Sequence, residues 1–225
     1  MIRSSANLDL LFSEVPLPAR FAAARAAGFD WVEMPCPYAM SIDEIDNALR
    51  RHDLQLASIA TPMGDADLGE CGFMGVPRRI ADFRQGSLKA GDYAEALDVE
   101  VIHLMAGIAD RSRSDKMLKR NLAWAAYNAP GHILALGPHD PAAWPGYAVE
   151  SLQHALDLIE WIGAPNLMLS FHTGVAQGSD AGAIATWKRF GPRLAHVQLS
   201  GADTEDTLLS AMKDDGYTGV LSPAP

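Results

Sequence analysis

Short apolar runs alternate with longer amphipathic runs along the whole chain of 225 residues. Short apolar runs are typical of buried strands, and apolar positions three and four residues apart are typical of helices that pack on them. The predicted strands are residues 8–12, 31–34, 54–59, 101–104, 133–136, 167–171, 194–198 and 220–221. The predicted helices are residues 17–27, 41–52, 78–97, 114–129, 149–162, 183–190 and 204–214.

This alternation predicts an α/β fold with parallel strands and right-handed crossovers. We expect a (β/α)8 TIM barrel that occupies residues 1–225 as a single domain, with its last β/α unit truncated. The absent final helix would leave apolar surface on the eighth strand, so a homo-oligomer that covers this surface is expected. A doubly wound open sheet is the alternative, but no glycine-rich phosphate fingerprint follows the first strand.

Three local motifs add detail to this prediction. Ser41 and Glu44 have the spacing of a capping box at the start of a helix. The segment 61–77 is a long loop with several glycines, and loops of this length inside a domain are often functional. The strand 133–136 ends in Gly137, at the position where barrel enzymes usually place a catalytic side chain. Gly137 can neither bind a metal nor transfer a proton.

Composition restricts the classes of partner. The formal net charge is −10, which argues against nucleic acid, because phosphate binding requires a basic face. No run approaches the ~20 apolar residues of a membrane span, and no signal peptide is recognisable. The two cysteines, Cys36 and Cys71, lack metal-type spacing and are expected to be reduced thiols. These features predict a cytoplasmic protein without a nucleic-acid or membrane partner.

Several segments resemble the hydroxypyruvate isomerase family, within the xylose-isomerase-like barrel superfamily. They are residues 6–8 and 11–12, Pro62 to Asp65 with Gly69, Glu70 and Gly72, His103 to Ile108, Pro138 with Pro141 and Pro145 to Tyr147, Gly163 to Leu167, His196 to Gln198, and Gly216-Tyr217 with Gly219. The resemblance covers nearly the whole chain. It implies a barrel that shifts a hydroxyl and a carbonyl between adjacent carbons of a small hydroxy-carbonyl acid.

The resemblance implies that a divalent metal is held in that family by two glutamates, an aspartate and a glutamine. It also implies that the two glutamates move the proton. The first glutamate falls on Gly137, and the second falls near Ala224. The aspartate falls on His172, and a histidine three residues beyond it falls on Val175. Only the glutamine is retained, as Gln198.

Magnesium and manganese prefer oxygen ligands, and carboxylates offset most of the cost of their dehydration. Three missing carboxylates therefore predict no tight Mg²⁺ or Mn²⁺ site, and no cofactor is expected. Imidazoles favour Zn²⁺, so a weaker candidate metal site combines His139, His172 and Gln198, with Asp140 nearby. The alternative is that His103 and His196 are hydrogen-bonded interior histidines and that His139 lies in solvent. The superfamily also contains nucleases of abasic DNA, which need a cluster of zinc ligands. The missing carboxylates and the net charge both argue against that activity here.

Two functional hypotheses remain open. The first is an isomerase-like protein with a rebuilt site, in which His172 and His139 are catalytic. The substrate-binding residues would be Glu33, Asp65, Glu70, His103 and Gln198. The alternative for Glu33, Asp65 and Glu70 is loop capping and turn formation alone. The second hypothesis is a catalytically inactive homologue that binds a small molecule or a protein partner.

Overall fold

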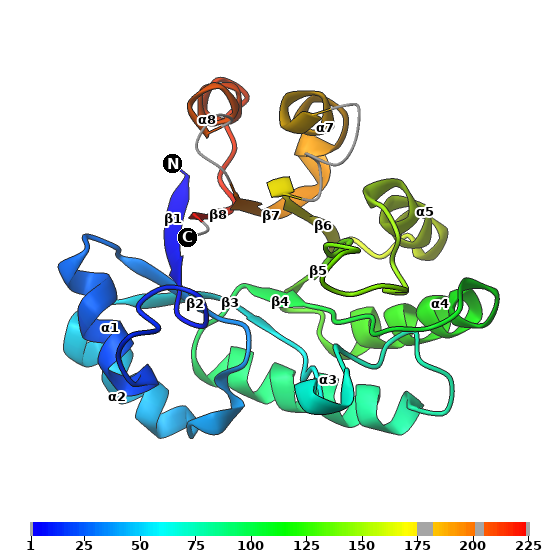
Figure 1. Cartoon of the computed structure of the whole chain (residues 1–225), viewed down its shortest axis with the longest axis horizontal. Helices are drawn as coiled ribbons and strands as arrows, with labels where there is room; N and C mark the ends of the chain where they lie inside the picture. The colour runs from blue at the N-terminus through cyan, green and yellow to red at the C-terminus, as the bar shows by residue number, and fades with distance from the viewer. Residues whose placement is uncertain (1, 175–181, 201–204, 224–225) are drawn as a thin grey trace.

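The computed structural model describes residues 2–174, 182–200 and 205–223 of the chain. Eight parallel strands close into a barrel in the order β1 to β8, and β8 pairs with β1 to complete the ring. Helices surround the strands on the outside (Figure 1). The prediction of a (β/α)8 barrel is confirmed, and the closed ring excludes the doubly wound open sheet.

Most predicted elements are present with ends shifted by a few residues. The strands are β1 (Arg3–Asn7), β2 (Trp31–Met34), β3 (Gln55–Ala60), β4 (Val101–His103), β5 (Ile133–Leu136), β6 (Leu167–His172), β7 (Leu194–Leu199) and β8 (Val220–Pro223). The helices with described bounds are α1 (Leu17–Ala26), α2 (Ile42–His52), α3 (Ile80–Ala96), α4 (Arg111–Asn128), α5 (Leu152–Ile162), α7 (Gly182–Phe190) and α8 (Glu205–Asp214). Short 3-10 turns are η1 (Pro37–Ala39), η2 (Ala66–Leu68) and η3 (Gly191–Arg193).

The first predicted strand, residues 8–12, is wrong. The strand is Arg3–Asn7, a segment that is mostly polar because Ser5 and Asn7 are enclosed by the barrel rather than exposed to water. The apolar run that follows is a turn, in which the backbone oxygen of Asn7 accepts bonds from the amides of Leu10 and Leu11. Hydrophobicity was therefore a poor guide where the barrel interior is polar.

Local capping explains where several helices begin. The predicted capping box of α2 is confirmed, because Ser41 Oγ accepts from the amide of Glu44 while Glu44 accepts from the amide of Ser41. Helix α5 begins at Leu152 rather than at 149, because Ser151 Oγ caps it by accepting from the amide of His154.

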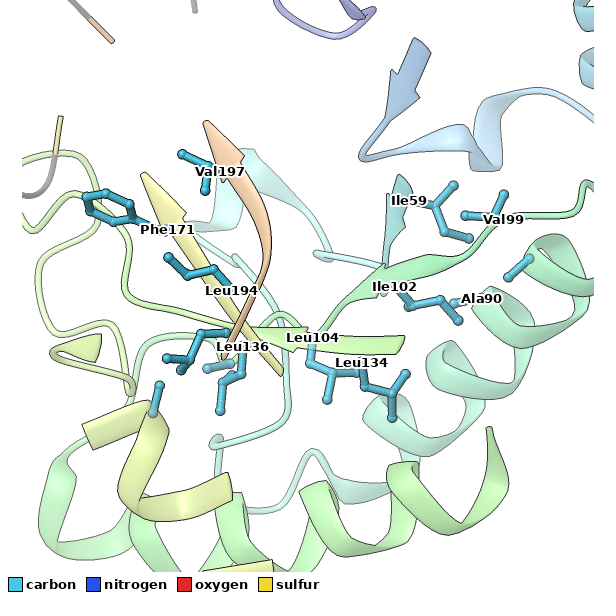
Figure 2. Close-up of a cluster of buried hydrophobic side chains, with 14 of the residues drawn as sticks. Ile59, Ala90, Val99, Ile102, Leu104, Leu134, Leu136, Phe171, Leu194 and Val197 are labelled. Carbon is cyan, nitrogen blue, oxygen red and sulfur yellow. The ribbon is translucent and has the colours of Figure 1, made fainter. Parts of the chain in front are cut away.

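The apolar core has two parts. The larger part lies between the strands and the helices, and Figure 2 shows some of its members on β3 to β7 together with Ala90 of α3. The smaller part combines side chains of β2 to β8 without any helix residue, so it fills one end of the barrel interior. Its members are Ala57, Val101, Ala135, Ala195 and Val220, with Trp31, Ile133 and Met168 packed against them.

The expected apolar surface on the eighth strand is absent from the described structure. Val220 and Leu221 are buried, and Leu221 shares the main core with Leu208 and Met212 of α8. The proposed homo-oligomer therefore loses the observation that motivated it. In the described part of the chain, none of the helices combines the length and apolar character that a membrane span requires.

The capping box gives a test of local stability. Replacing Ser41 with alanine removes the acceptor for an otherwise unpaired helix amide, and we expect unfolding to become easier by about 1 kcal/mol. Chemical denaturation measures this change. Ser13→Ala, at an exposed turn position, is the matched control and should leave the midpoint unchanged. Equal midpoints for both variants would show that the cap contributes nothing.

Candidate active site at the carboxyl end of the barrel

Polar side chains occupy the barrel interior toward the carboxyl ends of the strands. Glu33 comes from β2, His103 from β4, and His172 from β6, while β7 contributes both His196 and Gln198. The register places His172 beside Gln198. This end of a parallel barrel is where ligands and catalytic groups are normally found.

Glu33 is the centre of a buried hydrogen-bond network. Its side chain is only 2% exposed, and its Oε1 accepts hydrogen bonds from Ser5 Oγ and from His196 Nε2, the latter at 2.9 Å. Ser222 Oγ lies 3.3 Å from the same His196 nitrogen. Because Nε2 carries the hydrogen that points at the carboxylate, Ser222 Oγ is a second acceptor of that hydrogen. The network joins β1, β2, β7 and β8.

His103 and His196 meet across the barrel from opposite sides. Their ring centroids are 4.7 Å apart, and the rings are nearly perpendicular. Burial lowers the pKa of His103 well below its ordinary value, and the neighbouring His196 and His139 lower the pKa further. His103 is therefore a neutral imidazole that can donate one hydrogen bond and accept another. The expectation of a hydrogen-bonded interior histidine is confirmed for His196, but His103 has no hydrogen bond to another described side chain.

His139 does not lie in solvent, so that expectation is wrong. Its ring packs against Trp144 and Tyr147, with centroid distances of 4.6 Å and 4.8 Å. Burial lowers the pKa of His139 to about 4, and the proximity of His172 contributes to the shift. His139 is consequently neutral near pH 7.

The loops after β3, β4 and β5 are joined to one another, which fixes the position of His139. Bridges of antiparallel type pair Gly72 with Ala106 and Ile108 with Tyr147. The amide of Ala106 also donates to the hydroxyl of Tyr147 at 2.8 Å. Gly72 has φ +113, and a Cβ added there would overlap the backbone of Met105. The close approach of these loops therefore depends on glycine.

His172 is partly enclosed at the end of β6. Burial lowers its pKa, the carboxylate of Asp140 opposes this shift, and His196 adds to it. Its Nδ1 is buried without a hydrogen-bond partner in the described structure. A Cβ built on Gly174 would lie 2.9 Å from Cε1 of His172, so the backbone of this glycine passes close to the ring.

Asp65 and Glu70 are exposed or partly exposed residues of the loop after β3. Glu70 forms an ion pair with Arg79 and accepts a 2.9 Å hydrogen bond from the amide of Asp65. Asp65 Oδ1 accepts from the amide of Asp67 and caps η2. Both carboxylates therefore have structural partners, and the structure does not link them to the histidine group.

Gly137 is packed too closely to carry a side chain in this backbone. A Cβ built on it would overlap the carbonyl oxygen of Ser170 and lie 2.6 Å from Ser170 Oγ. The register between β6 and β7 shifts at this point, between Leu169 and Ser170. Side chains at position 137 would require the strand to move.

The donor set at this end of the barrel does not suit Mg²⁺ or Mn²⁺. Among the described residues, the groups at this end are imidazoles, the amide of Gln198 and the single carboxylate of Glu33, whereas these ions require several oxygen ligands. Among the described residues, no three His, Cys, Asp or Glu side chains come close enough to hold a metal ion. The candidate zinc site of His139, His172 and Gln198 gains no support from this geometry. Val175 and Ala224 lie outside the described residues.

Two pockets lie away from these groups. One of about 630 Å³ is at the amino-terminal end of the barrel, and one of about 500 Å³ lies between α3 and α4. A pocket of about 480 Å³ between the β4 and β5 loops is lined by His139, Trp144 and Tyr147. We place the candidate site by its convergent polar side chains, because volume alone does not supply chemistry.

Sequence reasoning missed two members of the network, Ser5 and Ser222. Ser5 was overlooked because the first strand was placed after it, and Ser222 because the last strand was ended at Leu221. The alternation of side chains between the two faces of a strand could have indicated both residues. Ser5 shares a strand face with Asn7, and Ser222 shares one with Val220.

The closed (β/α)8 fold is matched by a family of known barrels. Residues 21–223 match the family model described as xylose isomerase-like TIM barrel. The chain belongs to this family.

Similar proteins of known sequence support the resemblance to the isomerases. A human protein named putative hydroxypyruvate isomerase is 35% identical over 247 residues, covering 98% of this chain and 88% of its own length. A 2-oxo-tetronate isomerase of Haemophilus influenzae is 28% identical over 237 residues, covering 98% of this chain and 92% of its own. Both relatives are thus named as isomerases of small acids.

Solved structures show the same architecture. A crystal structure of a protein named AP endonuclease, family 2, from Brucella melitensis superposes with a TM-score of 0.94 and 29% identity. The superposition covers 100% of this chain and 93% of the Brucella chain. A D-allulose 3-epimerase from a Methylomonas species has a TM-score of 0.78 at 18% identity, covering 99% and 84%, which shows the fold alone.

The packing at Gly137 predicts the effect of a small substitution. Gly137→Ala should destabilise the protein by about 1–3 kcal/mol, because the new methyl group meets the Ser170 backbone. Gly131→Ala, where an added Cβ meets no atom within 4 Å, is the matched control and should change stability by less than about 0.5 kcal/mol. Thermal unfolding compares the two. A fully stable Gly137→Ala variant would contradict the packing argument.

The lowered histidine pKa values predict loss of stability in acid. The unfolded chain binds protons at His139 near pH 6.5, whereas the folded chain does so only near pH 4. Stability from this group is therefore present above pH 6.5 and is lost as the pH falls toward 4, by about 3 kcal/mol. Urea unfolding between pH 4 and 7 measures this slope. The slope should be shallower in His139→Gln, and an unchanged slope would count against a buried neutral His139.

Proposed function

We propose that this protein catalyses the exchange of a hydroxyl and a carbonyl between adjacent carbons of a small hydroxy-carbonyl acid. The observation that carries the proposal is the group of neutral imidazoles, His103, His139 and His172, at the carboxyl end of the barrel. Neutral imidazoles donate hydrogen bonds to carbonyl and carboxylate oxygens, and imidazole is the side chain most often used for proton transfer in catalysis. The names of the relatives, hydroxypyruvate isomerase and 2-oxo-tetronate isomerase, support this substrate class.

In this proposal the site has diverged from the pattern that the resemblance implies. Gly137 replaces a glutamate, and its packing against Ser170 gives no room for one. The site therefore works without a tight Mg²⁺ or Mn²⁺ ion. His172 and His139 donate to the substrate and transfer protons, while Gln198 and His103 bind its oxygens. Asp65 and Glu70 frame the entrance, with their carboxylates held by partners in their own loop and by Arg79.

A second function, binding without catalysis, is favoured by one specific observation. The packing around Gly137 closes the position from which the implied glutamate would act on substrate. A barrel of this kind would retain the imidazoles and Gln198 as a binding surface for a small acid, or would present its loops to a protein partner. Activity measurements separate this alternative from the isomerase.

The test uses protein purified without added metal. Conversion of hydroxypyruvate to tartronate semialdehyde, with 2-oxo-tetronate as a second substrate, should occur and should persist in the presence of EDTA. His172→Ala should lower kcat/KM by about 100-fold or more, because it removes a proton-transfer group. His52→Ala, in the last turn of α2, is the matched control and should retain full activity.

Other outcomes decide against parts of the proposal. Turnover that requires added Mg²⁺ would contradict the proposed divergence of the site. Stoichiometric zinc in the purified protein, lost in His172→Ala, would replace the metal-free site with the His139, His172 and Gln198 zinc site. Binding of a small acid without turnover of either substrate would establish the inactive homologue.

A further inference from the structure

Glu33 is a buried carboxylate to which the resemblance assigns no role in proton transfer. Both of its hydrogen bonds within the described structure, from Ser5 Oγ and His196 Nε2, go to the same oxygen, Oε1. No donor to Oε2 is found among residues 2–174, 182–200 and 205–223. The network therefore orients the carboxylate while leaving one of its oxygens without a partner.

His196 places Glu33 and His103 close together. The His196 ring contacts the carboxylate through Nε2 and contacts the His103 ring at a centroid distance of 4.7 Å. Glu33 of β2 and His103 of β4 thus both contact the His196 ring of β7. His103 has no hydrogen bond to another described side chain, so its ring nitrogens can serve a ligand.

These two groups match the requirements of an isomerisation that uses no metal. A base must remove a proton from the carbon that bears the hydroxyl, and a hydrogen-bond donor must stabilise the charge that develops on the carbonyl oxygen. A carboxylate base combined with a neutral imidazole is one established combination for this chemistry in a barrel enzyme.

We infer that Glu33 is the proton-transferring base of this site and that His103 is the hydrogen-bond donor to the substrate carbonyl. This inference rests on the proposed function and specifies its chemistry. It assigns to Glu33 and His103 the work that the resemblance gives to a metal and two glutamates. The inference therefore moves proton transfer from His172 and His139, where the proposed function placed it, to Glu33 and His103. His172, His139 and Gln198 then bind the remaining oxygens of the substrate.

The step balances without a co-reactant. Oε2 of Glu33 takes the proton from the hydroxyl-bearing carbon, the C–H electron pair forms a C=C bond, and the carbonyl oxygen takes the N–H proton of His103. The other hydroxyl group of the resulting enediol then gives its proton to His103. The oxygen of that hydroxyl group becomes the new carbonyl oxygen. Glu33 delivers its proton to the former carbonyl carbon. Both residues end in their starting states.

A purely structural role for Glu33 is the competing explanation. The network links β1 and β2 to β7 and β8, so it spans the closure of the barrel between the first and last strands. Loss of activity in a variant would then follow from a loosened barrel. The experiment must therefore separate proton transfer from stability and from substrate binding.

Glu33→Gln separates proton transfer from stability and substrate binding. Its amide oxygen still accepts hydrogen bonds from Ser5 and His196, but the side chain cannot act as a base. We expect kcat to fall by about 100-fold or more, with KM within about threefold of the wild-type value. Exchange of the carbon-bound substrate hydrogen for deuterium in D₂O, followed by NMR, should be lost as well. Ser5→Ala keeps the base but removes one orienting bond, and exchange should persist within about tenfold of the wild-type rate.

The outcomes distinguish this inference from the proposed function. Glu33→Gln with wild-type turnover and exchange overturns the inference and leaves the proposed function intact. Wild-type protein that exchanges the hydrogen through Glu33 without completing the isomerisation supports the inference and counts against the proposed function. Absence of both exchange and turnover in the wild type overturns both. Should Glu33→Gln fail to fold, Glu33→Asp must retain measurable but reduced exchange, and an unchanged rate contradicts the inference.

Discussion

The contact on which this barrel interior depends is the hydrogen bond between His196 and the buried carboxylate of Glu33. A carboxylate that is 2% exposed requires partners, because an unpaired buried charge would cost several kcal/mol. Ser5 and His196 supply them from strands on either side of the barrel closure. The same bond fixes the His196 ring, against which His103 packs. Strand pairing and the arrangement of polar groups are therefore coupled at one point.

Much of the fold followed from the sequence, because most strands carry apolar residues that face the helices. The runs at 31–34, 133–136 and 194–198 are of this kind, and all are strands. The first strand was misplaced since Arg3–Asn7 faces a polar interior, where hydrophobicity carries no signal. Caps were predictable only where the motif is local, as for Ser41 and Glu44.

The candidate site was less predictable. The sequence placed His103 and His172 at or just beyond strand ends, and the structure ends β4 and β6 at these residues. Their role at the site stays a prediction, based on where barrel ligands gather. Nothing in the sequence showed that His139 would pack between Trp144 and Tyr147, since that arrangement depends on bridges between three loops. The pairing of Glu33 with His196 joins residues 163 positions apart, and only the closed barrel brings them together.

The central claim is that this polar interior holds neutral imidazoles rather than cations or metal ligands. Nitrogen chemical shifts of the histidine side chains, recorded by NMR from pH 7 to pH 5 with and without Mg²⁺, test the claim directly. The account predicts that His103 and His139 show the neutral form throughout this range, that the Nε2 of His196 carries its hydrogen, and that Mg²⁺ changes none of these signals. An imidazolium signal from His103 at pH 7, or a shift on adding the ion, would contradict it.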